Sequence, residues 1–400
     1  MLRFPSKDAT APEKQQENDD EGARALETKK HEDERARVLA KRRDQGNHEC
    51  EVLGQGCEAA EASRTWNSCE KNPGHERFIP VSAFCIDDLP ERYRKQSFFD
   101  LVKGFSDLVV RLRVNYTSAK RPKGYPFHGS GGQNIAHTGS GLLSHVDTYE
   151  GDCECPDDST DNDGPHRKWF VVSVVTACHV VFDSEEASKT MVDFFYNDEV
   201  SRKDGRMKTV WAYCVTKRYV YGDLCIVDCV TCDLSLIDQL HHILLSKLPQ
   251  WGLFNSRDKF KVQKRSLCIV ISHSHGKSKQ ITVGNMESYT FKAHQRPELN
   301  FKYRTDTCHG SSGGLVIRFD CEFPVLILRA AIHVTGHGEI NESSTVVIET
   351  FDLHDARREL HQMKSEGNYM SMARNIVKKS HCENPLFRVS ASSFPFLKKD

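Results

Sequence analysis

The chain has 400 residues, with 55 Lys and Arg against 56 Asp and Glu, so its formal net charge is −1. This balance gives no general attraction to nucleic acids or membrane surfaces, and neither is expected as a partner. No stretch of about 18 apolar residues is present, and the first residues, "MLRFPSKDATAPEKQ", lack the apolar centre of a secretory signal. We therefore expect a cytoplasmic or nuclear protein.

The first segment, residues 1–76, is rich in charge and poor in aliphatic runs, as in "ETKKHEDERARVLAKRRDQ" at 27–45. Such a composition buries too little apolar surface to offset the loss of chain entropy. We expect a disordered charged leader, followed over 77–104 by a helical lead-in. Its apolar residues at helical spacing are Phe98, Leu101, Val102 and Phe105.

The main domain is predicted over residues 105–352, where two β-rich stretches flank one helix. Short strands with frequent turn signals fill about 105–232 and again about 262–352. Between them, "DLSLIDQLHHILLSKLPQW" has helical spacing, with Asp233 placed to begin the helix. Two equal sets of strands predict an all-β fold of two packed six-stranded antiparallel β-barrels. Residues 353–400 read as a C-terminal helix and tail.

The 15 cysteines show no disulfide-framework spacing and are expected to be free thiols in a reducing compartment. Cys225, Cys229 and Cys232 lie close together, but alternation along a strand separates them and no fourth ligand follows at finger spacing. The two histidines of "SHSHGK" at 272–277 are expected on a surface loop. The sequence thus predicts no metal site and no cofactor.

Three short segments offer the groups that acyl transfer to a serine requires. That chemistry needs a hydroxyl beside an imidazole, a carboxylate that orients the imidazole, and two backbone amides that face the developing oxyanion. "TACH" places His179 at the exit of a buried strand, and "GDLCIV" places Asp223 at the start of another. In "DTCHGSSGG", Gly310 and Ser312 frame a tight glycine turn.

In this order, the three segments resemble the signature segments of trypsin/chymotrypsin-clan peptidases, over about residues 105–350. The resemblance implies that Ser312 is the nucleophile, His179 the general base and Asp223 the orienting acid, with the amides of Gly310 and Ser312 as the oxyanion hole. Asp233 also fits the family's acid segment, but it is expected to begin the helix.

Two departures make the chain resemble HtrA-like and viral members more than secreted zymogens. Ser311 stands where secreted trypsins carry the Asp that pairs with a new N-terminus. The cysteine that normally follows the histidine is absent, because Cys178 precedes His179, and Cys308 has no evident partner. We therefore do not expect activation by the zymogen route.

The resemblance implies two rival specificity pockets. Asp306 lies where trypsin-like enzymes keep the carboxylate that pairs with substrate Arg or Lys. His333 in "AAIHVTGHG", together with Thr307 five residues before Ser312, instead resembles the pocket of picornavirus-type main proteases, which accept Gln or Glu. We favour Asp306 slightly and leave both open.

The function expected from these observations is that of an intracellular serine endopeptidase acting on protein or peptide substrates without a cofactor. A catalytically silent scaffold that binds partner proteins or peptides is the alternative, and an esterase is a third. The sequence does not predict the oligomeric state.

Overall fold

The computed structural model describes seven stretches of the chain, and everything below refers to them: residues 48–53, 58–151, 168–220, 222–247, 266–292, 298–322 and 325–349. The C-terminal helix predicted from residue 353, and residues 1–47 of the predicted leader, lie outside these stretches.

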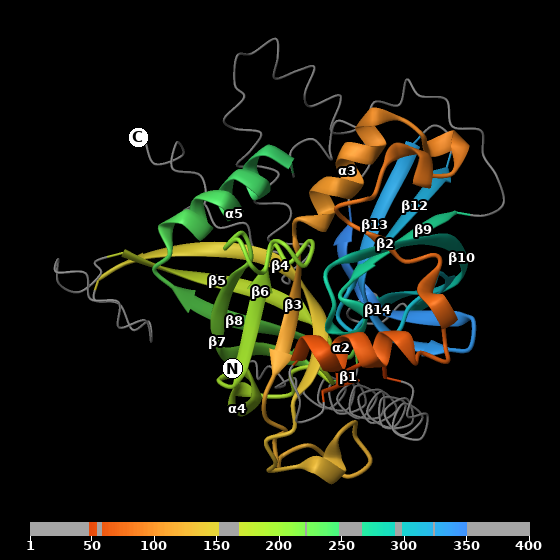
Figure 1. Cartoon of the computed structure of the whole chain (residues 1–400). Coiled ribbons are helices and arrows are strands. Elements are labelled where there is room, and N and C mark those ends of the chain that lie inside the picture. Colours follow the sequence, from red (N-terminus) through yellow and green to blue (C-terminus); the bar gives the residue numbers. More distant parts are fainter. Residues whose placement is uncertain are drawn as a thin grey trace, which may run out of the picture. The chain divides into compact units, whose positions relative to one another are not determined.

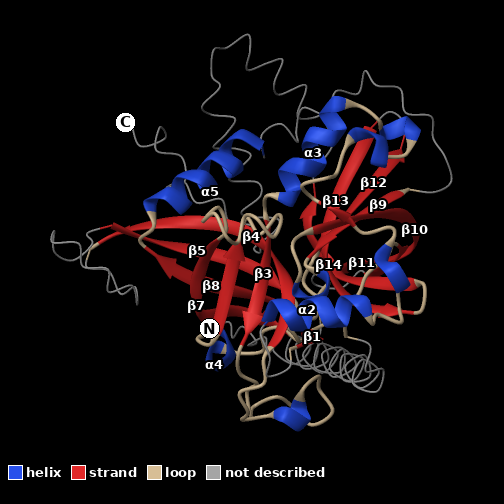
Figure 2. Ribbon diagram, viewed as in Figure 1, coloured by secondary structure: helices blue, strands red, loops and turns tan. Residues whose placement is uncertain are grey.

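The first β-barrel consists of six antiparallel strands (Figures 1 and 2). In chain order they are β3 (Val109–Val114), β4 (His137–Glu150), β5 (Lys168–Thr176), β6 (Thr190–Phe194), β7 (Lys208–Tyr219) and β8 (Leu224–Thr231). Their order in the sheet is β4-β3-β6-β7-β8-β5, and β4 pairs with β5 to close the ring. Closure pairs the edge strands with each other, so that the ladder has no open edge there.

The second barrel repeats this plan with the six strands that follow the connector. They are β9 (Leu267–Ser272), β10 (Gln280–Lys292), β11 (Glu298–Arg304), β12 (Leu315–Glu322), β13 (Val325–His337) and β14 (Ile340–Glu349). The order is β11-β14-β13-β12-β9-β10, and β10 pairs with β11 to close the ring. The prediction of two six-stranded antiparallel barrels, an all-β chymotrypsin-like architecture, is confirmed.

Two helices lie where the sequence predicts them. Helix α5 (Leu234–Lys247) connects the barrels, and Asp233 Oδ1 accepts a hydrogen bond from Leu236 N at 2.9 Å at its start. Helix α3 (Gln96–Ser106) buries Phe98, whose ring centroid lies 4.5 Å from that of Phe319 on β12. No helix among the described residues is long and apolar enough to cross a membrane.

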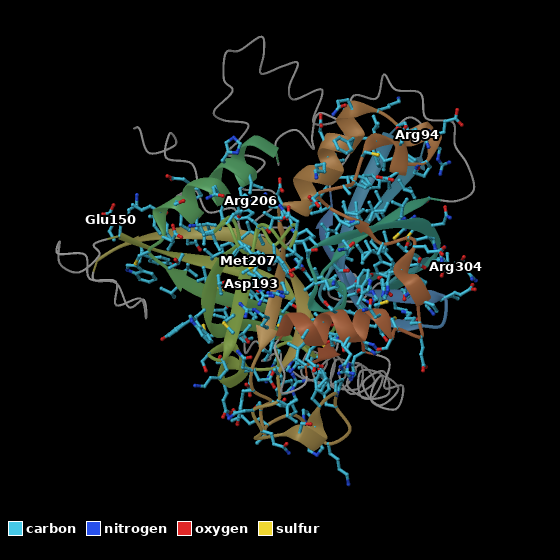
Figure 3. The ribbon with its side chains drawn as sticks, in the orientation of Figure 1. Arg94, Glu150, Asp193, Arg206, Met207 and Arg304 are labelled. Atoms are coloured by element: carbon cyan, nitrogen blue, oxygen red, sulfur yellow. The ribbon has the colours of Figure 1, made fainter. Side chains whose placement is uncertain are left out.

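Short helices complete the described chain, at α4 (Ser184–Ala187), η1 (Pro73–His75), η2 (Ile86–Asp88), η3 (Glu91–Tyr93), η4 (His128–Ser130) and η6 (Ser274–Gly276). Asp193 of β6 is fully buried, on the face of the strand opposite the core residues Val192 and Phe194 (Figure 3). Burial opposes its ionisation, but Arg111 and Arg113, each 2.7 Å away, hold the pKa of the Asp193 carboxyl below its usual value. A buried carboxylate of this kind persists only when it is paired.

The later part of the predicted leader is folded, which corrects the boundary drawn at residue 76. Strand β1 (Glu51–Val52) pairs with β4, and helix α2 (Glu58–Asn67) follows it. Strand β2 (Ile79–Pro80) adds to the second sheet through β10. Helix α2 is polar by composition but packs against η6, so that its fold is not evident from its own sequence.

Candidate active site

The pairing of β5 with β8 brings His179 and Asp223 together. Thr176, the last residue of β5, lies opposite Cys225 near the start of β8. His179 leaves β5 three residues after Thr176, and Asp223 enters β8 two residues before Cys225, so both side chains stand at the same end of the barrel. The antiparallel register therefore creates this pair from residues that are distant in sequence.

Hydrogen bonds join His179, Asp223 and Ser312 into one chain. His179 Nδ1 lies 2.6 Å from Asp223 Oδ2, and His179 Nε2 lies 2.7 Å from Ser312 Oγ. Asp223 Oδ1 also accepts from the backbone N of His179 at 3.0 Å and from the Tyr125 hydroxyl at 3.4 Å. All three predicted residues are buried and meet. Asp233, the alternative acid, begins helix α5 instead.

The backbone of Asp223 is held in a left-handed conformation, with φ of +52°. Such a conformation costs a non-glycine residue on the order of 1–3 kcal/mol and persists where surrounding contacts enforce it. Here the carboxylate is fixed by both its side-chain and its backbone contact with His179. Burial opposes protonation of His179, but Asp223 and Cys50 outweigh it and raise the pKa of the imidazole.

Glycines shape the turn that carries Ser312. Gly310 and Gly313 have φ of +92° and +82°. A Cβ on Gly313 would lie 1.9 Å from the carbonyl oxygen of Ser140, so only glycine fits there. The turn is bonded across to the first barrel, because Ser140 N donates to Ser312 O at 2.7 Å and Ser140 Oγ donates to Gly310 O at 2.9 Å.

The amides of Gly310 and Ser312 converge on one acceptor, which belongs to the chain itself. Gly310 N donates to the carbonyl oxygen of Glu49 at 2.6 Å, and Ser312 N donates to the same oxygen at 3.2 Å. Ser312 Oγ accepts from Glu49 N at 3.0 Å. A carbonyl held by two amides beside a serine hydroxyl is the arrangement in which an oxyanion could be stabilised.

The side chain of Glu49 enters a pocket of the second barrel. Its Oε2 accepts a hydrogen bond from His333 Nε2 at 2.6 Å, and its Oε1 contacts Lys71 Nζ. Lys71 also donates to Thr307 Oγ1 at 3.0 Å, and Thr307 donates to Asn341 Oδ1 at 2.9 Å. Burial opposes ionisation of Glu49, but His333 and Lys71 hold the pKa of its carboxyl well below its usual range.

Glu49 and Tyr303 together set the tautomer of His333. The Tyr303 hydroxyl lies 2.5 Å from His333 Nδ1, and burial keeps it protonated by raising its pKa well above the usual value. Since the ionised carboxylate of Glu49 can only accept, a neutral His333 carries its proton on Nε2, and its Nδ1 accepts from the Tyr303 hydroxyl. Burial also lowers the pKa of His333, so we take the imidazole as neutral and Lys71 as the balancing cation.

Of the two rival pocket assignments, the geometry brings together Thr307 and His333 and leaves Asp306 outside. The Asp306 carboxylate forms an ion pair with Arg77 at 2.6 Å, and Arg77 is largely exposed. The charge of Asp306 is thus already paired by a residue of the lead-in, which favours the pocket of Thr307 and His333. Three other residues of the site were not predicted from the sequence: Glu49, Lys71 and Tyr303.

No family model matches the chain, and no curated protein matches its sequence. Among solved structures, the active form of the Rv3671c protease from M. tuberculosis is 13% identical, covers 61% of this chain and 78% of its own, and gives a TM-score of 0.31. Its inactive form is 14% identical over 61% and 86%, with a TM-score of 0.29. The HtrA-type protease AlgW with a decapeptide is 14% identical over 67% and 66%, with a TM-score of 0.31. At these values the likeness carries no assignment of activity.

Proposed function

We propose that the protein is a serine endopeptidase. The observation that carries the proposal is the hydrogen-bonded chain Asp223–His179–Ser312 beside two amides that hold a peptide carbonyl. Ser312 Oγ would attack a substrate carbonyl while His179 Nε2 takes its proton. Asp223 would keep the other imidazole proton on Nδ1, and the acyl-enzyme ester would then be hydrolysed by water. No step requires a metal or an organic cofactor.

The pocket around Glu49 supports a preference for substrates with glutamate before the scissile bond. A neutral donor, His333, and a cation, Lys71, both face the carboxylate that now fills the pocket. A glutamine side chain could keep the His333 contact but would leave Lys71 without an opposite charge. Arg or Lys would place a second cation beside Lys71. Protein or peptide substrates with Glu at this position are therefore the class we propose.

Labelling with a fluorophosphonate probe tests the hydrolase assignment. We expect covalent labelling mapped to Ser312 once residues 48–50 no longer cover it, for example in a Glu49→Lys chain in which Lys71 repels the new cation. His179→Ala in that background should abolish labelling while leaving the thermal unfolding transition in place. Label mapped to another serine, or none at all in a folded Glu49→Lys chain, would refute the assignment.

A silent binding scaffold is the second candidate, and one observation favours it. The site is filled by the chain's own residues, and Ser312 is fully buried. A scaffold would bind peptides containing glutamate in the Glu49→Lys chain without cleaving them. Peptide-library cleavage followed by mass spectrometry separates the two: cuts after Glu select the peptidase, and binding without any cut selects the scaffold.

A further inference from the structure

Residues 48–53 run through the candidate active site and pair with a strand of each barrel. On one side of Glu49, His48 forms an antiparallel bridge with Thr335 of β13, and its ring centroid lies 5.7 Å from that of His179. On the other side, Glu51 and Val52 pair antiparallel with β4 of the first barrel. Added strands of this kind are a common mode of peptide recognition.

The Glu49–Cys50 peptide bond lies at the reacting atoms. The Glu49 carbonyl oxygen rests on the amides of Gly310 and Ser312, and Ser312 Oγ lies 3.0 Å from the Glu49 amide nitrogen. Cys50, the first residue on the leaving-group side, has its Sγ within 4.8 Å of a ring nitrogen of His179. The Glu49 side chain fills the specificity pocket at the same time.

We propose that the chain cleaves itself in cis between Glu49 and Cys50. This rests on the proposed function. Ser312 Oγ forms an ester with the Glu49 carbonyl carbon and gives its proton to His179. The C–N bond to Cys50 breaks, and His179 passes that proton to the new amine. Water then hydrolyses the ester, which restores Ser312 and leaves residues 1–49 with a carboxylate at Glu49.

Intact mass and N-terminal sequencing of the full chain test this proposal. We expect wild type to be split with Cys50 as the new N-terminus, and Ser312→Ala to stay whole. Glu49→Lys should lose processing, whereas Glu91→Lys, the same change at an exposed residue of η3, should process like wild type. Because the reaction is in cis, an excess of added Ser312→Ala chain should neither slow it nor be cut.

The outcomes separate this inference from the proposed function. A wild-type chain that stays whole, or is cut elsewhere, while the Glu49→Lys chain is labelled at Ser312 overturns self-processing and keeps the hydrolase. Residues 48–50 would then act as an inhibitor. Absence of labelling in the folded Glu49→Lys chain overturns both. Cutting of the added Ser312→Ala chain overturns the cis route.

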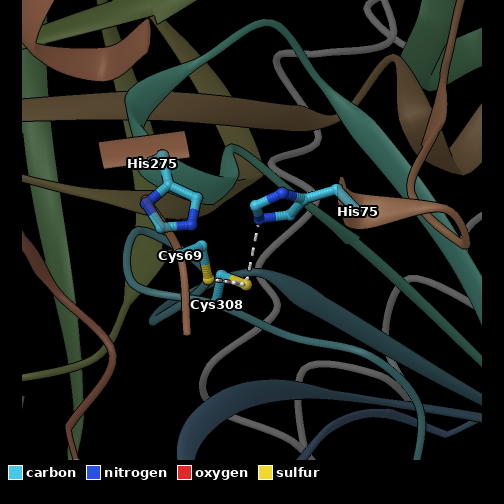
Figure 4. Close-up of side chains that lie close together, drawn as sticks. All are labelled: Cys69, His75, His275 and Cys308. Atoms are coloured by element: carbon cyan, nitrogen blue, oxygen red, sulfur yellow. Dashed lines mark hydrogen bonds between the residues drawn. The ribbon is translucent and has the colours of Figure 1, made fainter. Parts of the chain in front are cut away.

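A separate cluster of side chains has the geometry of a tetrahedral zinc site. Cys69 Sγ lies 3.6 Å from Cys308 Sγ, and Cys308 Sγ lies 3.4 Å from His75 Nε2. With His275, the four offer ligand atoms that all lie within 4.8 Å of one another. Figure 4 shows the two imidazole rings on either side of the two sulfur atoms. Zn–S bonds of about 2.3 Å and Zn–N bonds of about 2.0 Å at tetrahedral angles give separations of about 3.8 Å between sulfurs and about 3.6 Å between sulfur and nitrogen.

The imidazole of His275 is prepared for a metal. Its Nδ1 lies 2.6 Å from Glu51 Oε2, and its Nε2 is buried without a hydrogen-bond partner. A carboxylate that orients a histidine through its second nitrogen is the usual support of a zinc ligand. His275 and His75 both adopt left-handed backbone conformations, with φ of +55° and +50°. Both histidines thus have backbone conformations that few non-glycine residues adopt.

The two sulfurs also carry supporting contacts. Asn72 donates from Nδ2 to Cys308 Sγ at 3.0 Å and from its backbone N to Cys69 Sγ at 3.5 Å. Trp66 of helix α2 stacks on the ring of His75, with centroids 3.7 Å apart. Hydrogen-bond donors thus face both sulfurs, as the outer contacts of a metal site do.

We infer that Cys69, His75, His275 and Cys308 bind one zinc ion. Binding would displace the two thiol protons to solvent and tie the segment after α2 to the turn that carries Ser312. This inference does not depend on peptidase activity, and it replaces the expectation that the chain has no metal site.

Metal content of the full chain, purified without chelator, tests it. We expect one zinc per chain by elemental analysis and native mass spectrometry, and its loss in Cys69→Ser and Cys308→Ser. Cys85→Ser, at an exposed free cysteine, is the matched control and should keep the metal. Cobalt added to the metal-free chain should produce thiolate charge-transfer absorption, weaker in Cys69→Ser. A chain that takes up neither metal, or a Cys69–Cys308 disulfide in the non-reduced peptide map, overturns the assignment.

Discussion

Replacing Lys71 by Met tests the electrostatics of the pocket, because it removes the cation opposite Glu49 and keeps most of the apolar stem. The Lys71 side chain is 27% exposed and that of Glu49 is 5% exposed. The pair therefore lies between an exposed ion pair, which stabilises by up to about 1 kcal/mol, and a buried one, whose disruption costs about 3–5 kcal/mol. We assign about 2 kcal/mol to the interaction of the Lys71 charge with the glutamate, which corresponds to roughly 30-fold in kcat/KM.

The assay is kcat/KM of the processed enzyme for two peptides that span residues 45–54. One has the natural sequence and the other has glutamine in place of Glu49. Wild type should prefer the glutamate peptide, and Lys71→Met should lower that preference roughly 30-fold, because the neutral glutamine side chain forms no ion pair with Lys71. The four rate constants form a double-mutant cycle that isolates the coupling from general damage.

The control for this cycle is Asp306→Asn. Its carboxylate pairs with Arg77, so the ratio between the two peptides should not change. The reasoning is refuted if Lys71→Met keeps the wild-type ratio within roughly twofold, the range in which two independent sites are additive. It is equally refuted if Asp306→Asn alters the ratio as much as Lys71→Met does.

Three further predictions concern the scaffold of the site. Asp223→Asn should lower kcat by roughly 10⁴-fold with little change in thermal stability, as expected for loss of the correct imidazole tautomer; a loss below tenfold would place the acid elsewhere. Gly313→Ala should prevent folding or strongly lower the unfolding temperature, because the Cβ would collide with the Ser140 carbonyl; circular dichroism measures this, and a wild-type melting curve contradicts it. Arg121→Met should cost about 3–5 kcal/mol in the free energy of unfolding, because it removes the cation opposite the fully buried Glu186 and leaves only backbone donors on that carboxylate; denaturant titration measures the loss, and a cost below about 1 kcal/mol would mean that the backbone donors alone hold the charge.

The barrels and the hydrogen-bonded triad could be predicted from the sequence because their signals are local. Strand alternation and turn residues mark each β-strand, and His179, Asp223 and Ser312 each stand in a short distinctive segment at a strand end. The antiparallel pairing of the strands then brings these strand ends together. The choice of Asp223 over Asp233 was also local, since Asp233 begins a helix.

The sequence left the choice of pocket residue open, because that choice depends on contacts with distant segments of the chain. Asp306 and His333 are both plausible pocket residues in isolation. Arg77 neutralises the first, and Tyr303 hydrogen-bonds to the second, and neither contact leaves a trace in the local sequence. Glu49 carried no signal at all, because a single acidic residue in a charged segment looks like a solvated one.

The cluster of Cys69 and Cys308 illustrates the same limit in another form. "CEKNPGH" at 69–75 holds a cysteine and a histidine at a spacing that could suggest half a metal site. The other two proposed ligands come after the whole first barrel in the sequence: His275 lies in the turn between β9 and β10, and Cys308 lies just before Ser312. The packing of α2 against η6 and the hydrogen bond of Asn72 to Cys308 bring the two halves together.

Residues 50–53 take part in both inferences. Cys50 begins the downstream side of the proposed cut, and Glu51 contacts the proposed zinc ligand His275. Before processing, Glu49 and His48 hold the upstream side on the second barrel. After processing, nothing in the described structure detaches the downstream side, because Glu51 still pairs with β4 and still contacts His275. Cleavage would therefore empty the glutamate pocket while the new N-terminus at Cys50 stays beside His179. A second substrate must displace that terminus from the leaving-group side, so the processed enzyme should favour substrates that bind mainly through residues preceding the scissile bond.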